Sequence, residues 1–310
     1  MSLLKRAVRP LLPAALCSLF MLTACSADSL ATGGGPDGYW PQRIVIISVA
    51  DENNPDAVAG DENNRLAMEE FLGVQVEMFH DAIYAIGIEA LRAGNLDVML
   101  VTPMSFFLAQ QMANIEPLVY IYVEEADPYK TVFITHADRH DINSISDLRG
   151  RTFAFVDPAS SSGYMYPKAH LVTHYGLNPD NILNSGYFFE HVAFSGRHDA
   201  SLIGVSMGDF DAAAVAYVML GMLDEGGLVN RDAIKIIGET PIIPPPLYIV
   251  RADLPQSLKD AILEFYLTFD DPHYFEHRHG NPYARYTRAH EEDYDVIADL
   301  IRALNLEIVN

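Results

Sequence analysis

The sequence predicts an α/β protein with two lobes, each a mostly parallel sheet flanked by helices. Short β-branched strands alternate with helices along most of the 310 residues, and this order is typical of sheets covered by helices. One alternating unit is enclosed by the two halves of another, so we expect two strands to cross between the lobes, near residues 132–138 and 238–250. Half of the residues are apolar, and a body of this length can form a core without disulfides.

The first lobe is predicted over residues 41–135 and 239–310. Its first strand, at 43–48, is a β-branched run bounded by Pro41. Asp61 is expected to cap a helix that ends near Leu72. Further strands are expected at 74–79, 96–101, 118–123 and 247–251, and further helices at 84–93, 104–113, 256–269 and 291–304.

The second lobe is predicted over residues 136–238. Its first strand, at 152–156, leads through a serine-rich loop into a helix at 164–175. Strands at 187–192 and 211–218 follow, separated by a helix at 199–207. Ligands of open α/β sheets bind at the carboxyl ends of strands, so two lobes place these ends on either side of a cleft.

The N-terminus has the pattern of a bacterial lipoprotein signal peptide over residues 1–24. Three basic residues precede an apolar run at 11–22 that is too short to span a bilayer. The run ends in Leu22-Thr23-Ala24-Cys25, which resembles a lipobox and predicts lipidation of Cys25. The alternative is an ordinary secreted protein that is cut nearby. Residues 25–40 are rich in small residues and are expected to form a flexible tether.

Charge and cysteine content exclude several kinds of site. Cys17 lies in the segment expected to be removed, which leaves Cys25 as the only cysteine of the mature chain, with no disulfide and no cysteine metal site. The formal charge of −22 argues against a surface for nucleic acid. It also repels anions at long range, so an anion would have to be held by short-range hydrogen bonds.

The loop at 157–163 reads Asp-Pro-Ala-Ser-Ser-Ser-Gly and lies between a strand and a helix. A helix N-terminus offers unpaired N–H groups and a positive dipole end, and serines add hydroxyl donors. This pattern predicts a site for a tetrahedral oxyanion. The alternative is a serine-rich N-cap followed by an ordinary turn.

Five local patterns in order resemble the phosphate/phosphite/phosphonate substrate-binding proteins of ABC transporters, the PhnD-like group. The patterns lie at 84–98, 102–105, 157–163, 196–199 and 208–214. The resemblance implies a type II periplasmic-binding fold that captures a small phosphorus oxyanion between its lobes and delivers it to an ABC permease. It also implies a monomer without cofactor or catalytic activity, anchored to the membrane at the periplasmic or extracytoplasmic face.

The resemblance also implies the residues of the site. Hydroxyl and N–H donors would come from Ser160 and Ser161, with help from Ser162, and His198 would add a donor from the same lobe. Histidine suits this role because its proton count can follow that of the ligand. Its alternative is a structural histidine on a loop.

Three tyrosines complete the predicted site. Tyr84 and Tyr129 would seal the pocket from the opposite lobe, although either could instead be a core aromatic residue. Tyr217 would lie near the substituent of the ligand. Val218 and Met219 follow it where a carboxylate could pair with an ammonium group, so an amine-bearing ligand is disfavoured. Asp97 and Asp211 are expected to be structural.

Two other functions are alternatives to anion binding. A zinc-type lipoprotein could use His273, His277 and His279, but Pro272 and Gly280 interrupt this segment, which is expected to be a solvated helix end or turn. A hydrolase is disfavoured because the chain has no G-x-S-x-G elbow, and the serines before the helix form a cradle of donors rather than one exposed nucleophile.

Overall fold

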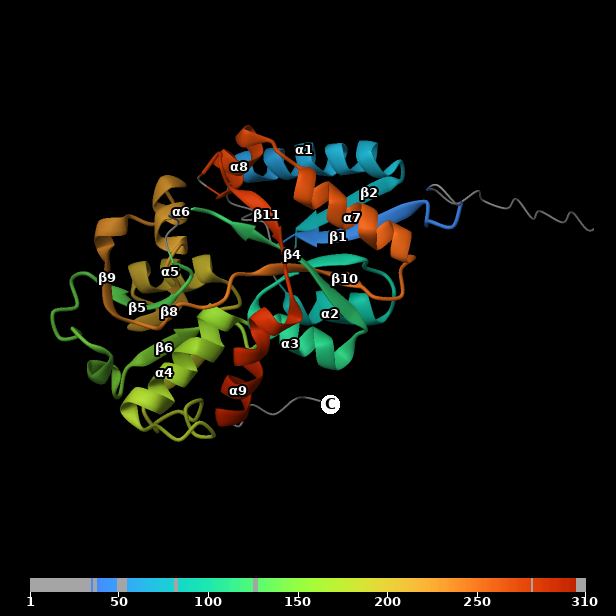
Figure 1. Ribbon diagram of the computed structural model, residues 1–310. Coiled ribbons are helices and arrows are strands. Elements are labelled where there is room, and N and C mark those ends of the chain that lie inside the picture. Colours follow the sequence, from blue (N-terminus) through green and yellow to red (C-terminus); the bar gives the residue numbers. More distant parts are fainter. Residues whose placement is uncertain are drawn as a thin grey trace, which may run out of the picture. The chain divides into compact units, whose positions relative to one another are not determined.

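The computed structural model describes residues 35, 38–48, 55–80, 83–124, 128–279 and 281–304 (Figure 1). These residues belong to one structural unit. The predicted signal peptide, the lipobox with Cys25 and most of the predicted tether lie outside the described residues.

Two sheets form the framework. The first has the order β11-β4-β10-β3-β1-β2, and the second has the order β7-β6-β8-β5-β9. The strands of the first sheet are β1 (Arg43–Ser48), β2 (Gln75–His80), β3 (Val98–Val101), β4 (Ile115–Tyr122), β10 (Leu247–Arg251) and β11 (Arg285–Arg288). Those of the second are β5 (Thr131–His136), β6 (Thr152–Phe155), β7 (His191–Phe194), β8 (Ala212–Ala216) and β9 (Ile234–Glu239).

Helices cover both faces of each sheet, and each sheet with its helices is called a lobe here (Figure 1). Lobe 1 contains the first sheet and lobe 2 the second. The helices of lobe 1 are α1 (Pro55–Leu72), α2 (Tyr84–Arg92), α3 (Pro103–Met112), α7 (Gln256–Thr268), α8 (Pro272–His279) and α9 (Asp295–Ala303). Those of lobe 2 are α4 (Tyr166–Tyr175), α5 (His198–Met207) and α6 (Met219–Glu225).

The predicted two-lobe α/β fold is confirmed, but its sheets are mixed rather than mostly parallel. In lobe 1, β1 is parallel to β2 and β3, whereas β10 is antiparallel to β3 and β4. In lobe 2, β6 is parallel to β7 and β8, whereas β5 is antiparallel to β8 and β9. Both β5 and β10 follow a crossing between the lobes. A chain that enters a sheet from the edge where the parallel strands end must run against them.

The crossings themselves lie at 123–130 and 240–246, between strands of different sheets. The first crossing precedes the expected position at 132–138, because Thr131–His136 pairs along its length with β8 and β9 of lobe 2. The second falls inside the expected range. A buried strand has the same apolar composition in either sheet, so its sequence does not state which lobe it joins.

Several element boundaries differ from the predictions. Helix α1 begins at Pro55, so Asp61 is not its cap but a buried residue within it. The segment around His273, expected to be a solvated helix end or turn, is helix α8, which starts at a proline and buries Tyr274 and Phe275. The prediction also missed the short elements α6, β9 and β11.

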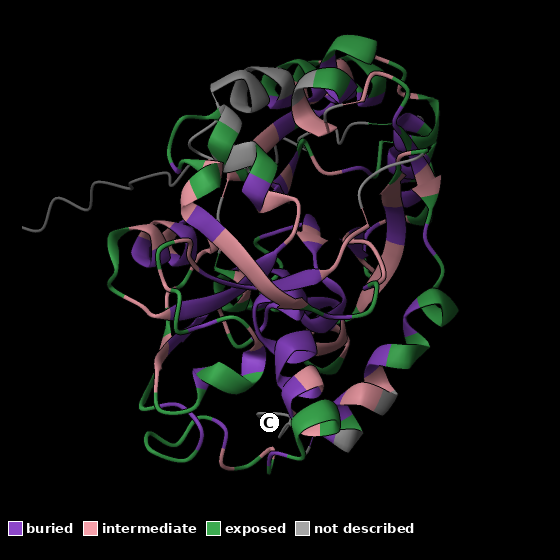
Figure 2. Ribbon diagram, turned by 90° about the vertical axis from the view of Figure 1, so that its left-hand side faces the viewer, coloured by how far each residue is buried: buried purple, intermediate pink, exposed green. Residues whose placement is uncertain are grey.

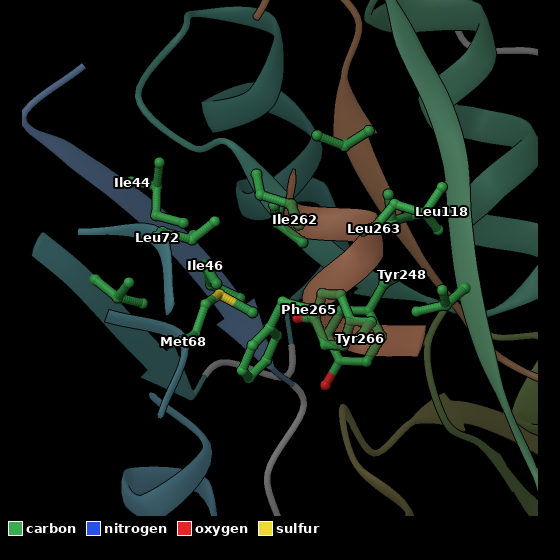
Figure 3. Close-up of a cluster of buried hydrophobic side chains, with 14 of the residues drawn as sticks. Ile44, Ile46, Met68, Leu72, Leu118, Tyr248, Ile262, Leu263, Phe265 and Tyr266 are labelled. Carbon is green, nitrogen blue, oxygen red and sulfur yellow. The ribbon is translucent and has the colours of Figure 1, made fainter. Parts of the chain in front are cut away.

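Buried residues concentrate on the strands of both sheets (Figure 2). In lobe 1, Ile44 and Ile46 of β1 pack with Met68 of α1 and with Phe265 of α7 (Figure 3). A second cluster on the opposite face joins helices α2, α3 and α9 to Met165 at the start of lobe 2. Apolar packing therefore continues across the junction between the lobes.

A buried ion pair ties α8 to α1. Arg278 Nε lies 3.3 Å from Asp61 Oδ1, and the two side chains are 8% and 2% exposed. Burial raises the pKa of Asp61, and the guanidinium of Arg278 opposes that shift. The pairing offsets part of the cost of burying a carboxylate inside an apolar lobe.

We expect Arg278→Met to lower the free energy of unfolding by about 3 kcal/mol at neutral pH, because it removes the guanidinium from beside buried Asp61 and leaves His80, 3.6 Å away, as the remaining ion-pair partner among the residues described. The folded state would then hold a proton on Asp61 more tightly than the unfolded state, so the loss should shrink as pH falls. Urea titrations at two pH values measure both effects. Arg43→Met is the matched control: Arg43 pairs with Glu77 at 54% exposure, and its loss should cost under about 1 kcal/mol. Equal losses in the two variants would contradict the prediction.

Candidate anion site between the lobes

The serine-rich loop begins after β6 and enters helix α4 through one π-helical turn, Ser161–Met165. Pro167 explains the turn, because it has no N–H to donate to the carbonyl of Gly163, which instead accepts from Val156 N–H at 3.0 Å. Gly163 is required by this close approach: a Cβ there would lie 2.3 Å from Cβ of Val156. The loop is thus held by its own backbone before any ligand binds.

Ser160 and Ser161 are both fully buried, and each accepts a backbone N–H. Ser160 Oγ caps the turn by accepting from Gly163 N–H at 3.0 Å. Ser161 Oγ accepts from Met104 N–H, in the first turn of α3, at 2.7 Å. Because α3 belongs to lobe 1, the loop lies where the two lobes meet. The hydroxyl hydrogens of both serines remain available as donors.

Ser162 lies at the centre of the donors. Tyr129 Oη donates to Ser162 Oγ at 3.1 Å, and His198 Nε2 lies 3.4 Å from the same oxygen. The carbonyl of Ser162 accepts from Thr131 Oγ1 at 2.7 Å. The structure therefore brings together three of the predicted site residues, one from the crossing segment and two from lobe 2.

The tautomer of His198 follows from its other contact. Ala216 N–H donates to Nδ1 at 3.2 Å, so in the neutral ring the proton sits on Nε2 and points at Ser162. Burial lowers the pKa of His198 to about 4, against a smaller opposing effect of Asp199. The ring is therefore a neutral donor at ambient pH, whereas from the sequence we expected its proton count to follow that of the ligand.

Tyr84 is the first residue of α2 and packs in the apolar cluster at the lobe junction, as does Tyr129. Burial raises the pKa of Tyr84 far above its usual value, with further contributions from Tyr129 and Asp157, which lie near it. Burial also raises the pKa of Tyr129 to about 12, although Ser162 opposes the shift. Both hydroxyls therefore stay protonated and can donate.

Tyr217 makes its contacts with Lys130. The Nζ of Lys130 lies 5.1 Å from the centroid of the tyrosine ring, and Tyr217 N–H donates to the Lys130 carbonyl at 2.9 Å. Lys130 is itself paired with Glu239 at 2.6 Å. Tyr217 directly follows Ala216, whose N–H donates to His198. Tyr217 is therefore one residue away, along the chain, from a residue that contacts the site.

Four helices begin at residues of the site. Tyr84 opens α2 and Pro103 opens α3, while Ser161 opens the turn before α4 and His198 opens α5. Each N-terminus carries the positive end of its helix dipole, but at α3 the N–H groups of Met104 and Ser105 already donate to Ser161 Oγ and Thr102 Oγ1. Together with neutral hydroxyl and imidazole donors, this arrangement can hold a small oxyanion without a cationic side chain.

The two aspartates that were expected to be structural have structural partners. Asp211 accepts from Thr152 N–H at 2.8 Å and also pairs with Arg139. Asp97 accepts from Val45 N–H at 2.8 Å and lies 3.5 Å from Arg251. Both join neighbouring strands of a sheet, which confirms the prediction.

Among the described side chains, no three histidines, cysteines or carboxylates are grouped as metal ligands. His279 is partly buried, and burial followed by the charge of Arg278 lowers its pKa to about 3. His273 accompanies it on α8, but the side chain of His277 is not among those described. The described part of α8 packs into the core of lobe 1 through Tyr274 and Phe275.

Sequence reasoning missed three contributors to the site. Thr102 Oγ1 donates to the Ala159 carbonyl at 3.3 Å, Met104 binds Ser161 through its N–H, and Thr131 binds the Ser162 carbonyl. Thr102 had a readable signal, since a threonine before a proline is typical of a helix start. The other two contacts join residues that are 57 and 31 positions apart, and no local pattern marks them.

Residues 49–294 match the model of a protein family described as "ABC transporter, phosphonate, periplasmic substrate-binding protein". The chain belongs to this family. Members of this phosphonate-binding family are the substrate-binding components of ABC importers, not enzymes. The phosphate-import protein PhnD of Mycolicibacterium smegmatis is 30% identical over 233 residues, which make up 72% of this chain and 70% of the relative.

Solved structures share the fold of this phosphonate-binding family member. A binding-protein component of an ABC phosphonate transporter from Pseudomonas aeruginosa has a TM-score of 0.73 at 20% identity, over 85% of this chain and 86% of that one. The periplasmic aliphatic sulphonate binding protein SsuA from Escherichia coli has a TM-score of 0.60 at 14% identity, over 85% and 92%. At these identities only the type II periplasmic-binding fold is shared. In the part of this family member that is described, no helix has the length and apolar character needed to cross a membrane.

We expect nitrogen-resolved NMR to find His198 neutral, with its proton on Nε2, at all pH values above about 5, because its pKa is lowered to about 4. A protonated His198 ring at about pH 6, or a proton on Nδ1, would contradict the geometry at Ala216.

Proposed function

We propose that this protein captures a small phosphorus oxyanion, such as phosphite, phosphate or a phosphonate, between its lobes and delivers it to an ABC permease. Its donors are Ser160, Ser161, Ser162, Tyr84, Tyr129 and His198, and Tyr217 lies on the side of the ligand's substituent. The family description names phosphonate, and the relative from M. smegmatis is named for phosphate import.

One observation carries the proposal: Tyr129 Oη and His198 Nε2 both direct their hydrogens at Ser162 Oγ, in the π-helical turn that leads into α4. A tetrahedral anion has several oxygens to satisfy, and a cluster of neutral donors from both lobes suits it better than one strong charge. The nearest cation named above, Lys130, is occupied by Glu239. A site built this way favours a small, highly polar anion over a large apolar ligand.

The ligand is tested by calorimetric titration with phosphite, phosphate, methylphosphonate, 2-aminoethylphosphonate and sulfate. We expect at least one phosphorus oxyanion to bind, and Ser162→Ala to weaken it by about 10- to 100-fold, because a hydrogen bond to a charged acceptor contributes about 1.5–3 kcal/mol. Ser146→Ala is the matched control, since Ser146 is an exposed serine of the same lobe. If none of the phosphorus compounds binds, or if both variants behave alike, the proposed function is wrong.

We also propose that the mature protein is a lipoprotein held at the periplasmic or extracytoplasmic face of a membrane through Cys25. Acyl chains on one cysteine contribute about 0.8 kcal/mol for each buried methylene, and two or more chains make the anchor stable. The small-residue segment after Cys25 would let the lobes move above the membrane.

The anchor is tested by expressing the full chain with Cys25→Ser in a bacterial host that processes lipoproteins. We expect the wild type in the detergent phase of a Triton X-114 partition and the variant in the aqueous phase, because the variant has no thiol to acylate. Cys17→Ser should behave as the wild type. Aqueous partition of the wild type would exclude lipidation.

A further inference from the structure

Asp157 is a carboxylate at the edge of the anion site, and the sequence patterns gave it no role. It opens the serine-rich loop two residues after β6. Its Oδ1 accepts from Ala159 N–H at 2.7 Å, and its carbonyl accepts from Ser160 N–H at 2.9 Å. These bonds fix the side chain beside the serines and leave its second oxygen without a structural partner among the hydrogen bonds described.

The surroundings of Asp157 do not neutralise it. The residue is half-buried, and no described basic side chain forms an ion pair with it. Burial raises the pKa of its carboxyl group, and only the Ala159 N–H opposes this shift. The loop meets lobe 1 two residues after Asp157, where the Ala159 carbonyl accepts from Thr102 Oγ1 at 3.3 Å, and Asp157 contributes to the raised pKa of Tyr84 of lobe 1.

A carboxylate beside an anion is repulsive unless a proton lies between them. The proton can belong to the ligand, as in a P–O–H group that donates to the free carboxylate oxygen. In that case the second oxygen of Asp157 gains a hydrogen bond and the repulsion of two negative charges is avoided. No covalent bond changes in this step.

We propose that Asp157 makes the site select oxyanions that carry a proton, so that it accepts a hydrogen phosphonate or hydrogen phosphate ion and rejects a fully ionised sulfonate or sulfate. This inference rests on the proposed function. It gives one side chain the task of reading the protonation state of the ligand, while the serines, tyrosines and His198 hold the remaining oxygens.

The shared fold makes such a selection necessary. SsuA, named as an aliphatic sulphonate binding protein, has the same architecture. A phosphonate and a sulfonate both present three oxygens on a tetrahedral centre, so neutral donors alone distinguish them poorly. They differ in that a phosphonate can keep one proton near neutral pH. A hydrogen-bond acceptor in a site of donors rejects the ligand that cannot donate to it.

The other ionisable groups at the site do not titrate between about pH 6 and about pH 9. The hydroxyl groups of Tyr84, from α2, and Tyr129, from the crossing segment, have raised pKa values, and the pKa of His198, from α5, is lowered to about 4. Helix α3 presents the neutral Thr102 and Ser105 to the loop. A pH effect on binding in this range therefore reports the proton shared by the ligand and Asp157.

The test is calorimetric titration of the full mature chain with methylphosphonate and methanesulfonate, from about pH 6 to about pH 9. For the wild type we expect methylphosphonate to weaken by close to tenfold per pH unit above its second pKa, since one proton is linked to binding. Near pH 7.5, methanesulfonate should bind at least about 100-fold more weakly.

Asp157→Asn keeps the amide oxygen that Ala159 N–H needs and removes the negative charge. We expect it to flatten the pH dependence and to bring methanesulfonate to within about tenfold of methylphosphonate. Asp209→Asn removes an exposed carboxylate from the same lobe and should leave both ligands unchanged. Thermal melting of each variant checks that the fold is intact, and the wild-type comparison stands without any variant.

Three results would overturn the inference alone. They are equal wild-type affinities for the two ligands, a wild-type affinity that does not change with pH, and an unchanged ligand ratio in Asp157→Asn. A preference for 2-aminoethylphosphonate that disappears in the variant would also overturn it, because Asp157 would then be reading an ammonium group. If the wild type binds neither methylphosphonate nor phosphite nor phosphate, the proposed function falls and this inference falls with it.

Discussion

The hydrogen bond from Ala216 N–H to His198 Nδ1 fixes the chemistry of the whole site. It determines which ring nitrogen carries the proton, and burial keeps the ring neutral. The neutral ring points its proton at Ser162, which Tyr129 approaches from the crossing segment. If Nδ1 carried the proton instead, the ring would present a lone pair to the site and repel an anion. A strand of lobe 2 thus sets the donor pattern through its backbone alone.

The mixed topology of the sheets explains how the donors meet. Strands β2 and β3 of lobe 1 and β7 of lobe 2 each lead into a helix, α2, α3 and α5, that begins at a residue of the site. The antiparallel strand β5 follows the crossing into lobe 2, and the antiparallel strand β10 follows the crossing back into lobe 1. Tyr129 lies just before β5, so a residue of the crossing itself contacts the serine loop. The mixed topology therefore determines both where the chain crosses between the lobes and where the site lies.

The sequence predicted what depends on local patterns. The strand at 43–48, the strand at 247–251 and the starts of α2 and α5 lie at or within one residue of their expected positions. The serine loop was identifiable because a glycine, small hydroxyl residues and a strand end occur in a short window. Ser162 and His198 were named through family resemblance, and their contact supports the choice.

What could not be predicted depends on contacts between distant residues. Asp61 was expected to be a cap from the local pattern, whereas its partner Arg278 lies more than two hundred residues away, on a segment interpreted as a solvated helix end or turn. The lobe that β5 joins is decided by its pairing with β8 and β9, which its apolar composition does not specify. The lowered pKa of His198 requires knowledge of burial, and the family patterns carry no information on it.

The named donors of the site include no cationic side chain although the protein is strongly acidic, and this has a consequence for how salt affects binding. A pocket lined with lysines binds anions more weakly at high salt, because dissolved ions screen the attraction between the lysines and the anion. Here the anion would be held by short-range hydrogen bonds, which salt screens little. The opposing effect is long-range repulsion by a chain with a formal charge of −22. Added salt screens that repulsion. We therefore expect the association rate of an anion with such a site to be higher in seawater than in fresh water.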